Sequence, residues 1–450
     1  MLRRYRLRTL AAASSAALLL LGALSACGGA DKGGGDATNG AGKTINMLVG
    51  VNNAFPDQQR AWFTDVSDAF KKQTGATVHF ETFASANEEL TKIQTSVLSG
   101  QGPDIYALGT TFTPTAYATK AFIELTADDW NAIGGRDRFV PATLGISGPD
   151  KEHEVGIPFA SRPFVMAYNK EMLTAAGIDK PADSWDGLLE QAKKMTGGGK
   201  YGLAIGYADN FDPWKFAWAM SIQAGNPLIK DNKASLNDPT TLKAYETYLG
   251  WLAKDKVVDP ASIGWKNAQA VVAFGQGKAA FLPMVSASSK VTLDKSSVAG
   301  KYGYALMPTI PPGMTSLGSD GVAAASILSG DNIVVAKYTK NKALALALVK
   351  YLTSAEQQDS YYKTFGELPT NAEEAKKLQS DPALAAMVDS ASKSVGTPFN
   401  GAWSQVQLAL LNVVVQSLPG ISKGQLDEAA LKSLVDKAQS TAQSALDKAK

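Results

Sequence analysis

The feature that most constrains the fold is an alternation of strand-like and helix-like segments at the start of the body of the chain. Ile45–Val51 is an apolar run of strand length, and a helical stripe follows it at Trp62, Val66 and Phe70. Thr77–Phe83 then alternates in polarity as a strand does. A second helical segment and a short apolar strand complete the order. This order predicts an α/β fold with a mostly parallel sheet and helices on both faces.

The later part of the chain predicts a second set of strands and a helical C-terminus. Strands are expected at 164–168, 278–284 and 302–307, and helices at 341–353, 355–365, 372–379, 382–393, 403–418 and 427–448. A mature chain of about 400 residues indicates more than one domain or lobe.

The first 26 residues have the features of a signal peptide. Four arginines precede an apolar run, Ala11–Leu24, which is shorter than the roughly 20 residues that span a bilayer. Leu24–Cys27 resembles the bacterial lipobox, and Cys27 is the only cysteine in the chain. We therefore expect residues 1–26 to be removed, Cys27 to be lipidated with fatty acids such as palmitate, and the Gly-rich stretch 27–43 to act as a flexible tether.

Composition and residue counts argue against several classes of protein. The net charge is +2, and the expected signal peptide holds four arginines. The mature chain therefore has no excess of positive charge with which to bind nucleic acid. A single cysteine allows no internal disulfide. His79 and His153 are the only histidines, and neither has the spacing of a metal site. We expect that the protein is not an enzyme and binds no cofactor. The alternative is an exported glycoside hydrolase, which needs two carboxylates at a separation that sequence cannot show.

Five segments occur in the order found in one bacterial family. They resemble motifs of the bacterial extracellular solute-binding proteins, family 1, of the maltose-binding-protein-like type. The segments are GQGPDIYALG (100–109), AFIEL (121–125), the stretch 156–196 that contains YNKEMLTAAG, FGQGKAAFLPM (274–284), and 342–370, which ends in FGELPT.

The resemblance implies a two-lobe, periplasmic-binding-protein-like fold of class II type. The chain of such a fold crosses the hinge three times, and the ligand lies in the cleft between the lobes. The expected crossings are near 163–164, 310–319 and 365–368, with 44–163 plus 320–364 as lobe 1 and 164–319 plus 365–450 as lobe 2.

The resemblance also implies a function. The chain is expected to be the substrate-binding lipoprotein of an ABC importer, anchored to the cell membrane at its extracytoplasmic face. It would be a monomer that captures a mono- or oligosaccharide and delivers it to the transmembrane permease subunits. The alternative is a non-sugar solute such as a glycerophosphodiester or a polyamine.

Candidate ligand-binding residues come from loops after strands, where open α/β sheets bind ligands, and from the resemblance. Each candidate also has a structural alternative to ligand binding. The asparagines could form turns, and the tryptophans could belong to the hydrophobic core. Arg162 could form an ion pair on the surface, and Asp320 could cap the local backbone. The resemblance implies that Trp403 stacks on sugar. The candidates are Asn52, Asn53, Thr110, Thr111, Arg162, Trp214, Trp218, Ser286, Asp320 and Trp403.

Overall fold

The computed structural model describes residues 39–449 of the chain. The expected signal peptide, Cys27 and most of the expected tether lie outside these residues. Within residues 39–449, no helix is both long and apolar enough to cross a membrane.

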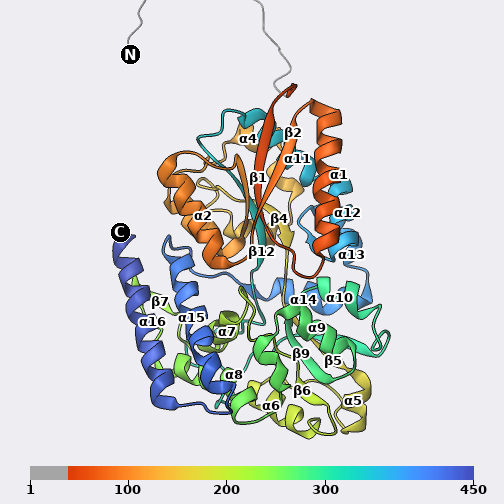
Figure 1. Ribbon diagram of the computed structural model, residues 1–450, viewed down its shortest axis with the longest axis vertical. Helices are drawn as coiled ribbons and strands as arrows, with labels where there is room; N and C mark the ends of the chain where they lie inside the picture. The colour runs from red at the N-terminus through yellow and green to blue at the C-terminus, as the bar shows by residue number, and fades with distance from the viewer. Residues whose placement is uncertain (1–38, 450) are drawn as a thin grey trace, which may run out of the picture. The chain divides into compact units, whose positions relative to one another are not determined.

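The first sheet has six strands in the order β13-β4-β12-β3-β1-β2 (Figure 1). β1 pairs in parallel with β2 and β3, while β12 runs antiparallel to β3 and β4, and β13 runs antiparallel to β4. The strands are β1 (Thr44–Gly50), β2 (Thr77–Phe83), β3 (Ile105–Gly109), β4 (Ile157–Ser161), β12 (Gly330–Val335) and β13 (Leu368–Pro369).

Helices cover both faces of this sheet, and together they form the first lobe. Met47 and Val49 of β1 belong to one hydrophobic cluster and Leu48 to another, as the period of two in a strand requires. Figure 1 shows α1 and α11 on one side of the sheet and α2 on the other. The helices are α1 (Pro56–Thr74), α2 (Ala86–Ser99), α3 (Thr113–Ala118), α4 (Ala127–Ala132), α11 (Lys342–Leu352), α12 (Ala355–Phe365) and α13 (Ala372–Leu378).

The local sequence explains why α1 begins and ends where it does. Pro56 stands in the first turn, where the missing N–H costs nothing. Trp62, Val66 and Phe70 are the buried residues of the helix, as their spacing predicts. Gly75 follows in the left-handed region at φ 78°, which a glycine adopts without strain.

The second lobe is built on a four-stranded sheet in the order β10-β5-β9-β6. Its strands are β5 (Val165–Asn169), β6 (Tyr201–Leu203), β9 (Ala279–Val285) and β10 (Tyr302–Ala305). Its helices are α5 (Lys170–Ala175), α6 (Trp185–Lys194), α7 (Trp214–Gln223), α8 (Pro239–Ala253), α9 (Asn267–Gly275), α10 (Ser288–Leu293), α14 (Ala385–Ser392), α15 (Trp403–Ile421) and α16 (Glu428–Lys448). Two small sheets pair β7 (Ile229–Lys230) with β8 (Lys233–Ala234), and β11 (Ser326–Ile327) with β14 (Ser394–Val395).

The chain passes between the two large sheets at three places. The first lies between β4, which ends at Ser161, and β5, which begins at Val165. The second lies between β11 and β12, at Leu328 and Ser329. The third lies between α13, which contacts β13, and α14, which contacts β5 and β10.

The second passage differs from the expected one near 310–319. The segment after Pro312 is held to the end of α7, because Gly318 N–H donates to Gln223 O at 3.1 Å and Val322 N–H to Ile222 O at 3.0 Å. Residues 318–322 therefore remain with the second lobe.

The third passage differs from the expected one near 365–368. Leu368 and Pro369 pair with β4 at the edge of the first sheet. The buried amide of Gln358 fixes this edge, donating to Phe159 O at 2.9 Å and accepting from Thr370 N–H at 2.8 Å. The chain therefore stays with the first lobe through α13.

Candidate functional site

A cavity of about 380 Å³ lies where the two lobes meet, and both contribute to its lining. The first lobe supplies the loops after β1 and β3 and the adjoining ends of β4 and β12. The second lobe supplies the start of α7, the start of α9 and the segment after β9. These loops follow the ends of strands, the position at which open α/β sheets bind ligands.

The loop after β1 brings two of the expected asparagines to the cavity. Asn52 Oδ1 accepts the N–H groups of Ala54 at 3.1 Å and Phe55 at 3.0 Å, so this side chain also forms the turn that leads into α1. Asn53 is exposed and lines the same cavity. Of the two, Asn53 has the side chain that is free to meet a solute.

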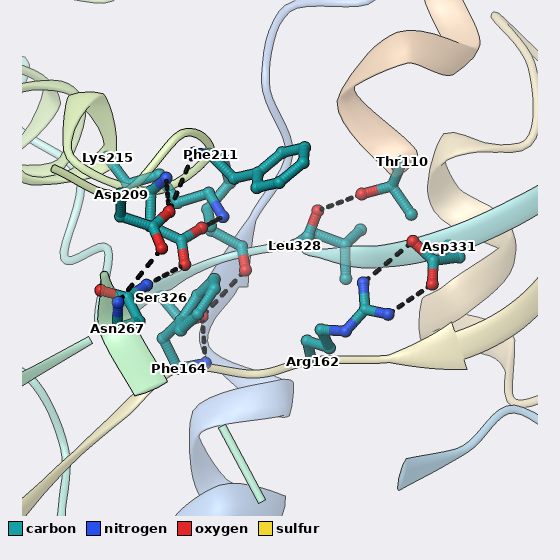
Figure 2. A network of polar contacts seen from close by, with 12 residues as sticks. Thr110, Arg162, Phe164, Asp209, Phe211, Lys215, Asn267, Ser326, Leu328 and Asp331 are labelled. Atoms are coloured by element: carbon teal, nitrogen blue, oxygen red, sulfur yellow. Dashed lines mark hydrogen bonds and ion pairs between the residues drawn. The ribbon is translucent and has the colours of Figure 1, made fainter. Parts of the chain in front are cut away.

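The loop after β3 places Thr110 and Thr111 on the cavity wall. They lie in a 3₁₀ turn, Thr110–Phe112, directly after the strand. Thr110 Oγ1 donates to Leu328 O at 3.3 Å, which ties this loop to the second passage between the lobes (Figure 2).

Arg162 stands at the end of β4 and pairs with two acids. Its Nη1 donates to Asp331 Oδ1 at 2.9 Å, Nη2 contacts the other oxygen of Asp331 (Figure 2), and Nε lies 2.8 Å from Glu367 Oε2. Burial lowers the pKa of Arg162, but the attraction of the two carboxylates outweighs it and holds the pKa well above its usual value. The guanidinium is charged, and each of its three nitrogens already faces a carboxylate.

This ion triad holds three neighbouring strands together at the cavity. Arg162 follows β4, Asp331 lies on β12, and Glu367 directly precedes β13, which are adjacent in the sheet. Burial raises the pKa of Glu367, although Arg162 opposes the shift. The triad carries one more negative than positive charge when all three groups are ionised.

A second polar network lies on the second-lobe side (Figure 2). Asp209 accepts the N–H groups of Phe211 at 2.9 Å, Asp212 at 3.1 Å and Asn267 at 3.2 Å. Lys215 pairs with Asp212, and its Nζ lies 4.4 Å from the centroid of the Phe164 ring. Burial and the nearby Asp212 raise the pKa of Asp209.

Glu89 of α2 adds a buried carboxyl group to the cavity wall. Its Oε1 accepts from Gly109 N–H at 3.0 Å. Burial raises the pKa of Glu89 well above its usual value, Gly109 opposes the shift, and Asp331 adds to it. A carboxyl group in this setting favours its protonated form.

Replacing Glu89 with glutamine should stabilise the protein near neutral pH and have little effect in acid. The folded state keeps the Glu89 proton at pH values where the unfolded state, with a pKa near 4.5, has released it. Stability therefore falls as the pH rises from about 4.5 through the raised pKa. Glutamine can still accept from Gly109 and carries no charge. Melting temperatures of both proteins, measured across this range, should diverge as the pH rises.

The control for Glu89→Gln is Asp68→Asn on the exposed face of α1. The Asp68 carboxylate is exposed to solvent, so the melting temperature of this variant should differ from that of the parent by only a small amount across the same pH range. A constant difference for Glu89→Gln as well would contradict the raised pKa.

The lining of the cavity holds more acidic than basic groups. Two of the three basic groups, Arg162 and Lys215, are paired with acids. The acids are Glu89, Asp209, Asp212, Asp331 and Glu367, and the bases are Arg162, Lys215 and Lys266. Burial raises the pKa of Glu89, Asp209 and Glu367, so the number of acids is an upper limit on the negative charge. A donor-rich neutral solute would meet acceptors here, whereas an anionic solute would meet cations that are mostly paired already.

The structure brings seven of the ten candidate residues to this cavity. They are Asn52, Asn53, Thr110, Thr111, Arg162, Trp214 and Ser286. Ser286 follows β9, and its Oγ lies 2.9 Å from Ser288 Oγ.

The other three candidates do not line the cavity. Trp218 and Trp403 are fully buried in the hydrophobic cluster of the second lobe, where Trp403 packs edge-on against Trp214. Asp320 is exposed in the 318–322 segment beside the end of α7. We therefore assign Trp403 to the core, in contrast to the stacking role that the resemblance implies.

Several lining residues were not among the candidates, and some carry a signal in the sequence. Glu89 precedes Ile93 by four positions and Ser96 by seven, so it lies on the buried face of α2. Phe211 belongs to the aromatic run that starts α7. Asp331 and Glu367 have no local signal, because they reach Arg162 only through strand pairing.

Comparisons with known proteins agree with this architecture. The model of the family described as bacterial extracellular solute-binding protein matches residues 65–386. A binding protein of Brucella abortus (strain 2308) is 26% identical over 321 residues, which cover 70% of this chain and 74% of that protein. The diacetylchitobiose binding protein DasA of Streptomyces coelicolor is 24% identical over 399 residues, which cover 85% of this chain and 87% of that protein.

A solved structure shows the same fold. Maltose-bound MalE3 of T. maritima matches with a TM-score of 0.72 and 20% sequence identity, covering 88% of this chain and 98% of that chain. The two-lobed α/β fold expected from the sequence is confirmed, but the expected mostly parallel sheet is not found, because β12 and β13 pair antiparallel to their neighbours and the sheet is mixed.

Proposed function

The chain belongs to the family of bacterial extracellular solute-binding proteins, and from that membership we propose that it captures a mono- or oligosaccharide outside the cell membrane for an ABC importer. In this proposal it performs no chemistry on the solute. It hands the sugar to the transmembrane permease subunits as a monomer.

The observation that carries the proposal is the chemistry of the cavity lining. A sugar needs acceptors for its hydroxyl hydrogens and flat rings for its C–H faces. The lining offers carboxylates and amides beside the rings of Phe211, Trp214 and Tyr361. The known ligands of two similar proteins, diacetylchitobiose and maltose, are uncharged sugars.

The charges of the cavity lining favour a sugar over a glycerophosphodiester. A glycerophosphodiester needs free cations, and of the three in the lining only Lys266 makes no ion pair within the described residues. A polyamine is the second candidate, because the excess of carboxylates would favour a cation.

We expect binding to bring the two lobes together around the solute, as in hinge closure. The three passages, at 162–164, 328–329 and 379–384, would form the hinge. The lobes would then be 39–161 with 330–378, and 165–327 with 385–449.

A binding panel tests the function directly. Glucose, maltose, diacetylchitobiose, glycerol 3-phosphate and spermidine would each be titrated into the purified protein by calorimetry and thermal shift. A sugar present at 100 times its Kd should stabilise the protein by about 2.7 kcal/mol. If spermidine is the one compound that binds, the proposed ligand class changes from a sugar to a polyamine. Release of a cleaved product from any sugar would contradict the binding role.

The proposal places the protein on the membrane through Cys27, which lies outside the described residues. Its support is the lipobox-like sequence before the only cysteine. The expected result is a membrane-bound protein that Cys27→Ser releases, measured by cell fractionation and by the mass of the N-terminal peptide. A parent protein found only in the soluble fraction would contradict the anchor.

A further inference from the structure

Gln407 of α15 is a buried polar residue on the cavity wall. Its side chain lines the cavity, yet the residue is only 3% exposed. Its Oε1 atom has no hydrogen-bond partner within the described residues. A buried polar atom without a partner costs free energy, and native proteins satisfy most such atoms.

The helix holds this side chain in a fixed position. Val406 and Leu410, on either side of Gln407 in α15, are fully buried in the second-lobe core. Leu408 packs against a hydrophobic cluster of the first lobe. Gln407 therefore has little freedom to turn toward solvent.

The start of α15 is also tied to the first lobe. Thr115 Oγ1 of α3 lies 2.6 Å from Ser404 Oγ and donates to Gly401 O at 3.0 Å. Gln407 is one turn further along the helix and belongs to the lining of the cavity where the two lobes meet. A side chain at this position can hold a solute against both lobes.

We propose that the amide of Gln407 binds a hydroxyl group of the captured solute and contributes to its selection. The inference rests on the proposed function and adds a specificity residue on α15 to it. A hydroxyl group can donate to Oε1 and accept from Nε2, so it satisfies the amide in either orientation. A solute with an apolar group at this point leaves the amide unpaired and is rejected.

The rival explanation is a hydrogen bond within the protein. Trp403 is one turn earlier on α15, and its Nε1–H also lacks a partner within the described residues. A small rotation could pair the indole N–H with Gln407 Oε1. The two explanations make opposite predictions for the protein without solute.

The test replaces Gln407 with methionine, which has the same length and no hydrogen-bonding amide. In the free protein we expect an unchanged or higher melting temperature, because the unpaired polar atom is gone. For the sugar of the panel that binds best, we expect Kd to rise about tenfold. The matched control is Gln405→Met on the exposed face of α15, for which Kd should change by less than about twofold.

Monodeoxy analogues of that sugar separate recognition from a structural effect. In the parent protein, the analogue that lacks the contacted hydroxyl should bind about tenfold more weakly than the sugar. In Gln407→Met the two should bind within about twofold, because the partner is already absent.

Two results would overturn the inference. One is a lower melting temperature of free Gln407→Met than of Gln405→Met, which would show that the amide is paired within the protein. The other is an unchanged Kd. If the parent protein binds no compound of the panel, the proposed function is overturned instead. The melting temperatures of free Gln407→Met and Gln405→Met then decide whether the amide of Gln407 is unpaired.

Discussion

Replacing Arg162 with methionine should lower the free energy of unfolding by about 3 kcal/mol, one of the two largest effects expected here. The side chain of Asp331 is 19% exposed and that of Glu367 is 8% exposed, so neither acid can recover full hydration when the cation is lost. Asp331 and Glu367 would then repel each other at the wall of the cavity. Urea unfolding followed by circular dichroism measures the change.

The loss in Arg162→Met should depend on pH. Burial already raises the pKa of Glu367 in the folded state, and Arg162 opposes that shift, so loss of the cation should raise the pKa of Glu367 further. Stability then falls as the pH rises through this pKa, so the deficit should be largest near neutral pH and smaller in acid.

Two further variants test whether charge is the cause. The triple variant Arg162→Met, Asp331→Asn, Glu367→Gln removes all three charges and should recover most of the loss. Arg60→Met breaks the exposed pair of Arg60 with Asp57 on α1 and should cost no more than about 1 kcal/mol. An equal loss in Arg162→Met and Arg60→Met would contradict a structural role for the triad.

The triad also shows why sequence predicts some features better than others. The helices follow from local spacing: Trp62, Val66 and Phe70 are buried as their period requires, and Gly75 ends α1. Asp331 and Glu367 are more than 160 residues from Arg162. No local pattern brings these groups together, because their meeting depends on the order of strands in the sheet.

The two tryptophans of α7 show the same limit on a smaller scale. Trp214 lines the cavity, and Trp218 does not, although both lie on one face of the helix. Every residue of α7 is buried, so the helix has no exposed face to indicate its orientation. A helix that is buried on all sides has a core position, but its sequence cannot show which end reaches the cavity.

The third passage between the lobes is hard to place from sequence for a related reason. The resemblance implies a crossing near 365–368, where Gly366 and Pro369 interrupt the helical pattern. In the structure, the two-residue strand that includes Pro369 pairs at the edge of the sheet. Proline is tolerated at such an edge because it needs no further ladder bond there. A strand this short has no periodicity to reveal it.

Replacing Trp403 with alanine should lower the free energy of unfolding by about 3–5 kcal/mol. The indole is fully buried and packs edge-on against Trp214, with 5.9 Å between ring centroids. Its removal would leave a cavity between α7 and α15. Weaker sugar binding in this variant would follow from lost structure, so binding by Trp403→Ala cannot by itself reveal a stacking role.

Trp403→Phe separates the core role from the ligand role. Phenylalanine keeps most of the apolar contact and removes an Nε1–H that has no partner among residues 39–449, so the stability loss should be well below that of the alanine variant. Because the indole lies behind the cavity wall, Kd for the sugar should stay within about twofold of the parent value. Calorimetry on the folded variant checks this. A tenfold weaker affinity without loss of stability would mean that Trp403 reaches the solute after the lobes close, and the core assignment would then hold only for the solute-free form.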